Sequence, residues 1–125
     1  MKIEVPISIG ELYDKQSILF VKLTNIKDPE KLKNIQKEYD LLTKICEKYP
    51  IESHYWFELV NINTHLWAVE DNIRIKESKK EYDDKFIAFA KEVYYTNDKR
   101  AEVKREINKQ YDSEIIEEKE YVKYE

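Results

Sequence analysis

The sequence predicts an all-α protein, in which an antiparallel helical hairpin and further helices pack into a small helical bundle, as one domain over residues 1–125. Three observations support this. The chain has one glycine and three prolines, whereas β-hairpin turns need glycine at positive-φ positions. Charged residues make up 38% of the chain, which suits helices with solvated outer faces. Apolar side chains recur at three- and four-residue steps along most of its length.

The first predicted helix covers residues 8–26. It follows an extended lead-in over residues 1–7, because Pro6 disfavours a helical conformation in the residue before it. Ser8 and Glu11 have the spacing of a capping box, so Ser8 should cap the helix and Glu11 should reach back to it. The apolar face of this helix comprises Leu12, Leu19, Leu23 and Ile26.

The second predicted helix starts at Asp28 as N-cap, with Pro29 in its first turn, and ends before Pro50. The short connection to the first helix favours antiparallel packing of the two. Its apolar positions follow the steps of a coiled-coil seam, and the position of Cys46 in this seam favours a buried, unreactive thiol. The seam comprises Leu32, Ile35, Tyr39, Leu42, Cys46 and Tyr49.

Two further helices follow, over residues 53–78 and 83–95. Both have apolar positions at helical spacing. The inward-facing residues are Leu59, Ile62, Leu66, Val69 and Ile73 in the first, and Phe86, Phe89, Ala90 and Val93 in the second.

The last third of the chain is predicted to contain two more helical segments. Thr96, Asn97 and Asp98 are residues typical of helix N-caps, so they predict a new helix, or a kink, from there to about residue 111. After a break at residues 112–113, a last short helix is predicted from Glu114 to about Tyr121 and should dock through its apolar side chains.

Composition limits the classes of function. The net charge of −4 gives no bulk attraction to nucleic acid or to an anionic membrane. One cysteine excludes an internal disulfide framework and fits a reducing compartment. The first residues lack the apolar run of a signal peptide, and no stretch approaches the length of a membrane span. We therefore expect a cytoplasmic protein with no cofactor, no membrane partner and no nucleic-acid partner.

The most informative polar residues form one line at helical spacing, Asn97, Arg100, Lys104 and Asn108, which we call the polar line. Arg100 and Lys104 have no acidic residue three or four positions away, and their like charges are four positions apart, which is mildly destabilising in an isolated helix. The line also begins at a predicted helix N-terminus, where anions are favoured. An acidic group is therefore expected to face it.

That acidic group has two possible sources. It could belong to the chain itself, either Glu70 or Glu77 in the third helix, or Glu117 and Glu118 in the tail. It could instead be the phosphate or carboxylate of a bound ligand. Asp98 in the predicted first turn weakens the second possibility, because it already uses the helix dipole.

Other candidate sites have simpler explanations. His54 and His65 are eleven residues apart on one predicted helix, too far to share a metal ion, and no metal-binding motif is present. Arg74 has acidic residues on both sides at helical spacing, which predicts a solvated salt network. Tyr94 is one of several tyrosines near the polar line in sequence, and it could stack on a ring or pack in an interface.

Four stretches, residues 7–15, 66–74, 86–108 and 117–121, resemble an uncharacterised family of small bacterial and phage proteins. The motifs are SxGExxDK, LWxxEDxIR, NDxRAxxKRxIN and EEKxY, in that order. The resemblance implies no defined activity. The frequent location of bacterial members among surface-polysaccharide genes hints at sugars or nucleotide sugars, and phage members would suggest a handler of host metabolites. Its recurrent polar positions correspond to Asp14, Lys15, Glu70, Asp71, Arg74, Asn97, Asp98, Arg100, Lys104, Asn108, Glu117 and Glu118.

Three functions are compatible with these observations. The first is a non-enzymatic module that binds a small anionic ligand, such as a nucleotide, a cyclic nucleotide or a sugar phosphate. The second is a structural or interaction protein, homo-oligomeric through its first two helices, whose polar line contacts its own tail. The third and weakest is a Mg²⁺-dependent nucleotide phosphohydrolase that uses Glu70, Asp71 and Glu77. The ligand-binding residues of the first hypothesis are Asn97, Arg100, Lys104, Asn108, Arg74 and Tyr94.

Overall fold

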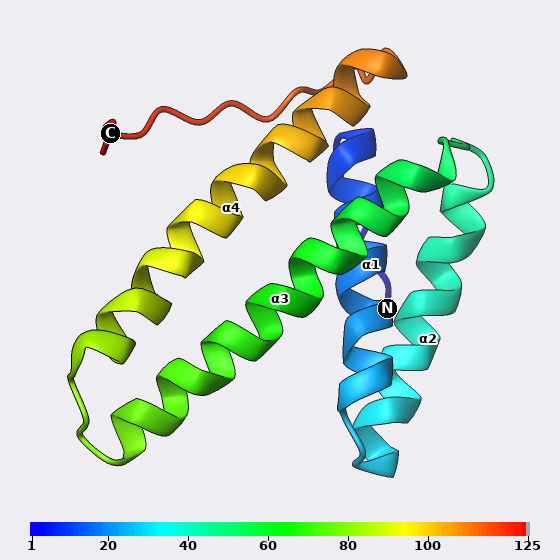
Figure 1. Cartoon of the computed structure of the whole chain (residues 1–125). Helices are drawn as coiled ribbons and strands as arrows, with labels where there is room; N and C mark the ends of the chain where they lie inside the picture. The colour runs from blue at the N-terminus through cyan, green and yellow to red at the C-terminus, as the bar shows by residue number, and fades with distance from the viewer. Residues whose placement is uncertain (125) are drawn as a thin grey trace.

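The computed structural model describes residues 1–124, and in that range it contains four α-helices and no strand (Figure 1). The predicted all-α fold is confirmed. None of the helices in the described range is both long enough and apolar enough to cross a bilayer. The helices are α1 (Ile9–Asn25), α2 (Pro29–Cys46), α3 (Ser53–Ser78) and α4 (Asp84–Gln110).

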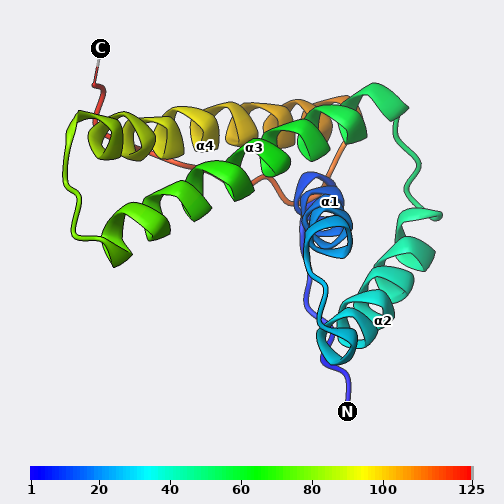
Figure 2. The ribbon, with the colours of Figure 1, turned by 60° about the horizontal axis from the view of Figure 1, so that its bottom comes forward.

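Helix α1 is central to the arrangement. It packs against α2, α3 and α4, whereas α2 has no helix other than α1 as a neighbour in the described part of the chain. Helices α3 and α4 form a second antiparallel pair, and Figure 2 shows this pair diverging from the α1–α2 pair. The turn between α3 and α4 therefore lies far from α1, as Figure 1 also shows.

Capping side chains explain where the first two helices begin. The backbone N–H of Glu11 donates to Ser8 Oγ at 3.0 Å, which confirms Ser8 as the cap of α1. Asp28 caps α2, with Pro29 at the first position, also as predicted. The prediction that Glu11 reaches back to Ser8 is wrong, because the Glu11 carboxylate accepts from Lys104 on α4 instead.

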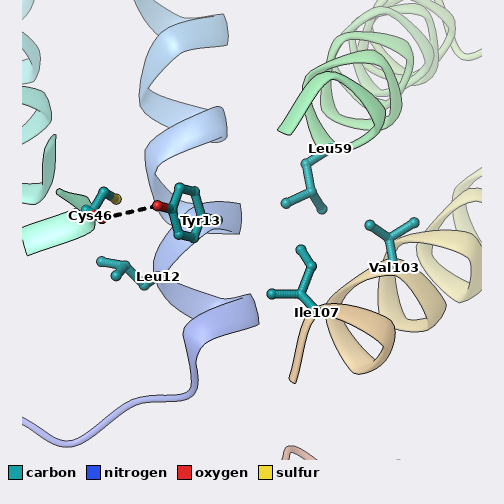
Figure 3. Close-up of a cluster of buried hydrophobic side chains, with 6 residues drawn as sticks. All are labelled: Leu12, Tyr13, Cys46, Leu59, Val103 and Ile107. Carbon is teal, nitrogen blue, oxygen red and sulfur yellow. Dashed lines mark hydrogen bonds between the residues drawn. The ribbon is translucent and has the colours of Figure 1, made fainter. Parts of the chain in front are cut away.

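The apolar core forms where α1 meets the other three helices (Figure 3). Leu59 of α3 and Ile107 of α4 are completely buried there. On the α2 side, the Tyr13 hydroxyl donates to the Cys46 carbonyl oxygen at 3.0 Å and to the Tyr49 carbonyl oxygen at 2.8 Å. Cys46 is 5% exposed, and burial raises the pKa of its thiol to about 11, which confirms a structural thiol.

The predicted seam of α2 is used within the chain. Cys46 belongs to the core cluster, and Leu42 packs against that cluster. The ring of Tyr39 lies 6.5 Å from that of Phe20 on α1, centroid to centroid. Tyr49 is the member that stays exposed. Association of two copies through the first two helices stays a prediction.

Helix α4 is one uninterrupted helix of 27 residues, so the predicted new helix or kink at Thr96 is wrong. Thr96 is buried, and the two side chains after it have partners of their own. Asn97 Oδ1 accepts from Arg100, and Asp98 accepts from the hydroxyl of Tyr124. Side chains engaged in this way do not compete for the helix backbone, so the helix continues through them. No helix N-terminus is therefore present here to favour an anion.

The tail, residues 111–124, is not helical, so the predicted helix from Glu114 to Tyr121 is also wrong. Asp112, at φ 51°, turns the chain, and the tail then passes back along α4 (Figure 1). Glu117 and Glu118 each pair with a cation thirteen residues earlier. Further along the tail, the Tyr124 hydroxyl donates to Asp98, nearer the start of α4, so these contacts hold the tail along the helix without a helix of its own.

Candidate ligand-binding site

The polar line of α4 lies against the first turns of α1, where Gly10 permits a close approach. A Cβ atom at Gly10 would lie 2.5 Å from the Lys104 carbonyl oxygen and 2.9 Å from Asn108 Oδ1. The Gly10 N–H donates to Asn108 Oδ1 at 2.7 Å, and the Ile9 N–H donates to Ser113 Oγ at 3.1 Å. Side chains from α4 and the tail thus satisfy backbone groups that the start of a helix leaves free.

Asp14 is the buried centre of this contact. It is 0% exposed, and it accepts two hydrogen bonds from Arg100: one from Nε at 2.8 Å and a shorter one from Nη2. Asn63 of α3 donates to the same carboxylate at 3.1 Å. The bond to Asp14 raises the pKa of Arg100 further above its already high value. Among the described residues, the third guanidinium nitrogen, Nη1, has a single hydrogen bond, to Asn97 Oδ1 at 3.4 Å.

Lys104 faces three carboxylates although its side chain is only 8% exposed. Its Nζ lies 2.6 Å from Glu11 Oε2, 2.9 Å from Glu117 Oε1 and 3.9 Å from Asp14 Oδ2. Burial acts to lower the pKa of Lys104, but the hydrogen bonds to Glu11 and Glu117 outweigh it, and the pKa is raised. The hydrogen bond that Glu117 accepts from Lys104 lowers the pKa of Glu117.

A pocket of about 260 Å³ opens between α1, α4 and the tail. Its size is slightly below the usual range for drug-sized ligands, so it would hold a phosphate with a small ring rather than a large cofactor. Polar and charged side chains make up nearly all of its lining, which comprises Glu11, Asn97, Arg100, Ala101, Lys104, Glu117 and Lys119.

The structure brings together most of the predicted ligand-binding residues. Asn97, Arg100 and Lys104 line the pocket, and Asn108 lies beside it, buried against Gly10. Arg74 does not line the pocket; its side chain is 74% exposed, with Asp71 as its nearest acid at 4.0 Å.

Tyr94 lies three residues before Asn97, the first of the pocket residues on α4. Its ring centroid is 5.1 Å from that of Tyr95 and 4.9 Å from that of Tyr124 in the tail. The tail therefore docks on α4 through an aromatic group at its far end and through Glu117 and Glu118 in its middle.

Sequence reasoning correctly included Glu117 among the possible partners of the polar line, but missed the larger contribution of α1. Glu118, the other tail residue named, pairs with Arg105 outside the line. Glu77, the alternative on α3, accepts from Tyr82 instead. Glu11 and Asp14 lie three residues apart on one face of α1. Two acids at this spacing on α1 complement two cations four apart on α4, and that match was the available signal.

The histidines are unrelated to the pocket. His65 Nε2 lies 3.0 Å from Glu92, and His54 Nδ1 lies 3.2 Å from Glu52. Within residues 1–124, no group of three or more His, Cys, Asp or Glu side chains is arranged to hold a metal ion.

Comparison with known proteins identifies a family but no activity. Residues 1–124 match the model of a family of unknown function (DUF6165). No curated protein and no solved structure gives a significant match. What the pocket can bind is therefore inferred from the residues that line it.

Proposed function

This chain belongs to the DUF6165 family, and we propose that it binds a small anionic ligand, a nucleotide or a sugar phosphate, in the pocket between α1, α4 and the tail. The observation that carries the proposal is the position of Arg100 and Lys104 together in the wall of a polar pocket. Paired cations in a partly desolvated site are typical of phosphate recognition.

The tail supplies a model for how an anion would sit. Glu117 places one carboxylate oxygen 2.9 Å from Lys104 Nζ, at the rim of the pocket. With Glu117 in place, two cations face three carboxylates, including Glu11 and Asp14. If a ligand displaces Glu117, two cations and two carboxylates remain. The ligand's charge would then be held by Lys104, by Nη1 of Arg100 and by Lys119.

The aromatic group favours a ligand with a ring. Tyr94 precedes Arg100 by six residues on α4, which is about 9 Å along the helix axis. That separation is comparable to the distance between the phosphate and the ring of a nucleotide. A ring could stack on Tyr94 while its phosphate reaches the pocket, and aromatic stacking tolerates different bases or sugars.

The first test is binding of inorganic phosphate, AMP and adenosine by calorimetry and thermal shift. We expect AMP to bind more tightly than phosphate, and adenosine to bind least. Glu117→Gln should increase the affinity for AMP several-fold, because it removes a carboxylate that competes from a short tether at millimolar effective concentration. Glu118→Gln is the matched control, since its partner Arg105 does not line the pocket.

Lys119→Ala tests the pocket without disturbing the buried contact, because Lys119 is exposed. The expected result is weaker AMP binding with an unchanged melting temperature. Failure of phosphate, AMP and a nucleotide sugar to bind either the wild type or Glu117→Gln at millimolar concentration would contradict the proposal.

A second candidate, the structural or interaction protein, is favoured by a specific observation: both cations already have carboxylate partners within the chain. In that case Glu117→Gln lowers stability slightly and creates no affinity for AMP. The phosphohydrolase alternative has no comparable support, because Glu70, Asp71 and Glu77 are not gathered into a possible metal site in the described structure.

A further inference from the structure

The segment before α1 is exposed and makes no polar contact with the rest of the described molecule. Residues 1–7 contain no helix or turn, and in the described range no hydrogen bond or ion pair joins them to another residue. Figure 2 shows the segment projecting away from the four helices. Its apolar side chains are unusually open to solvent: Ile3 is 81% exposed and Val5 is 67% exposed.

The pattern of this segment is that of a β-strand. Apolar residues at positions 1, 3, 5 and 7 alternate with Lys2, Glu4 and Pro6, so an extended chain would place all apolar side chains on one face. Its backbone N–H and C=O groups have no partners among residues 1–124, which is the condition under which an edge strand pairs with another chain.

We infer that residues 1–5 of two copies pair as an antiparallel ribbon about a two-fold axis at Ile3, so that the protein forms a symmetric dimer. In this register Ile3 lies opposite Ile3 of the second copy, and Met1 lies opposite Val5 of the second copy. Lys2 of each copy then lies opposite Glu4 of the other. The partner of the exposed segment is thus the same segment of a second copy. This inference does not depend on the proposed ligand.

The register follows from charge and side-chain direction. A shift by one residue would place the apolar side chains of the two strands on opposite faces. A shift by two residues keeps the faces aligned but places Lys2 opposite Lys2, or Glu4 opposite Glu4, and like charges directly opposite are destabilising. Only the register centred on Ile3 joins one apolar face with two pairs of opposite charge.

The backbone agrees with this register. If Ile3 forms a hydrogen-bonded pair with its copy, the ribbon contains about six inter-chain hydrogen bonds and brings Lys2 and Glu4 together in the closer, non-hydrogen-bonded positions. Pro6, which cannot donate, falls just outside the paired residues. A ribbon of five residues is marginal by itself, so the dimer is expected to depend on protein concentration.

A charge-swap experiment on the full chain tests the pairing. Sedimentation equilibrium over a range of concentrations should show a monomer–dimer equilibrium for the wild type. Lys2→Glu and Glu4→Lys should each weaken it by about ten-fold or more, because each replaces two attractive pairs with two repulsive ones. The double variant K2E/E4K should restore it. Lys33→Glu, on the exposed face of α2, is the matched control and should have no effect.

A cross-linking experiment tests the two-fold position. Ile3→Cys should form a disulfide-linked dimer under mild oxidation, because paired residues on the axis have Cα atoms within disulfide range. Val5→Cys should not, because two copies of residue 5 would be about 14 Å apart along the ribbon. A wild type that stays monomeric, a dimer unaffected by the single swaps, a double variant that fails to recover, or equal cross-linking at both positions would each overturn the inference.

Discussion

The two contacts that α1 makes with α2 and with α4 are built differently. Towards α2, Leu12 and Tyr13 contribute apolar side chains to a packed core, with one hydroxyl bonded to backbone carbonyls (Figure 3). Towards α4, Gly10 removes a side chain altogether, and Asp14 holds a buried guanidinium. An apolar contact tolerates substitutions of similar shape, whereas a buried ion pair at a close backbone approach tolerates neither a change of charge nor a change of size.

The largest effect is expected from Asp14→Asn, which keeps the shape but leaves Arg100 without its counter-charge. We expect the free energy of unfolding to fall by about 3 kcal/mol, measured by urea denaturation. Leu12→Met, a change of similar shape on the α2 side, should cost less than about 1.5 kcal/mol. Equal losses for the two variants would mean that the two contacts do not differ as described.

Gly10→Ala should come next. In an ordinary helix interior this change stabilises by up to about 1 kcal/mol. Here the new methyl group would meet the Lys104 carbonyl oxygen at 2.5 Å, and the helices would have to separate. We expect a loss of about 2 kcal/mol, with Lys15→Ala on the exposed face of α1 as control. A gain in stability for Gly10→Ala would show that α1 and α4 are not closely apposed.

Tyr13→Phe examines the hydroxyl that α1 buries against the end of α2. It removes the hydrogen bonds to the Cys46 and Tyr49 carbonyl oxygens while keeping the ring. Burial raises the pKa of Tyr13 to about 12, so the hydroxyl keeps its proton at all ordinary pH values. A loss of about 1 kcal/mol is expected. Tyr39→Phe is the control. A similar loss of stability in that variant would show that the loss in Tyr13→Phe does not come from its hydrogen bonds.

The smallest effect concerns Glu117 at the edge of the α4 contact. Its pKa is lowered in the folded state by Lys104, below the usual value of 4.5. Its contribution to stability is therefore present above pH 4.5 and is lost as the pH falls through the lower, folded-state pKa. Because Glu117 is partly exposed, the difference between wild type and Glu117→Gln should stay below about 1 kcal/mol and shrink with added salt. Melting curves of both proteins across pH 2–7 would measure this difference. A difference that persists at pH 2 would contradict the role given to the Glu117 carboxylate.

Local signals predicted the fold well where they were not opposed by tertiary contacts. Ser8, Asp28 and Pro29 set the starts of α1 and α2, and the apolar steps identified α3 over its full length. The same reasoning failed at Thr96, because residues typical of helix caps also bond to other side chains, as Asn97 does to Arg100 and Asp98 does to Tyr124 in the tail.

The site was only half predictable for a related reason. The absence of intrahelical partners at Arg100 and Lys104 correctly indicated that acidic groups from elsewhere would face them. The identity of those groups depended on contacts across 86 and 93 residues, Arg100 with Asp14 and Lys104 with Glu11, which no local pattern encodes. Only the close approach allowed by Gly10 brings these acids to α4.

The unbroken course of α4 has a consequence for how this protein can vary in length. Each residue turns an α-helix by about 100°. Tyr94 and Arg100 are six residues apart and so lie about 120° apart around the helix axis. One residue inserted between them would change this angle by about 100°, while Arg100 stayed on Asp14. Insertions in the α3–α4 turn or in the tail would leave that angular relation unchanged. Length changes should therefore be accepted at the two ends of α4 and rejected within it, so the helix acts as a fixed spacer between the aromatic group around Tyr94 and the ion pairs of Arg100 and Lys104.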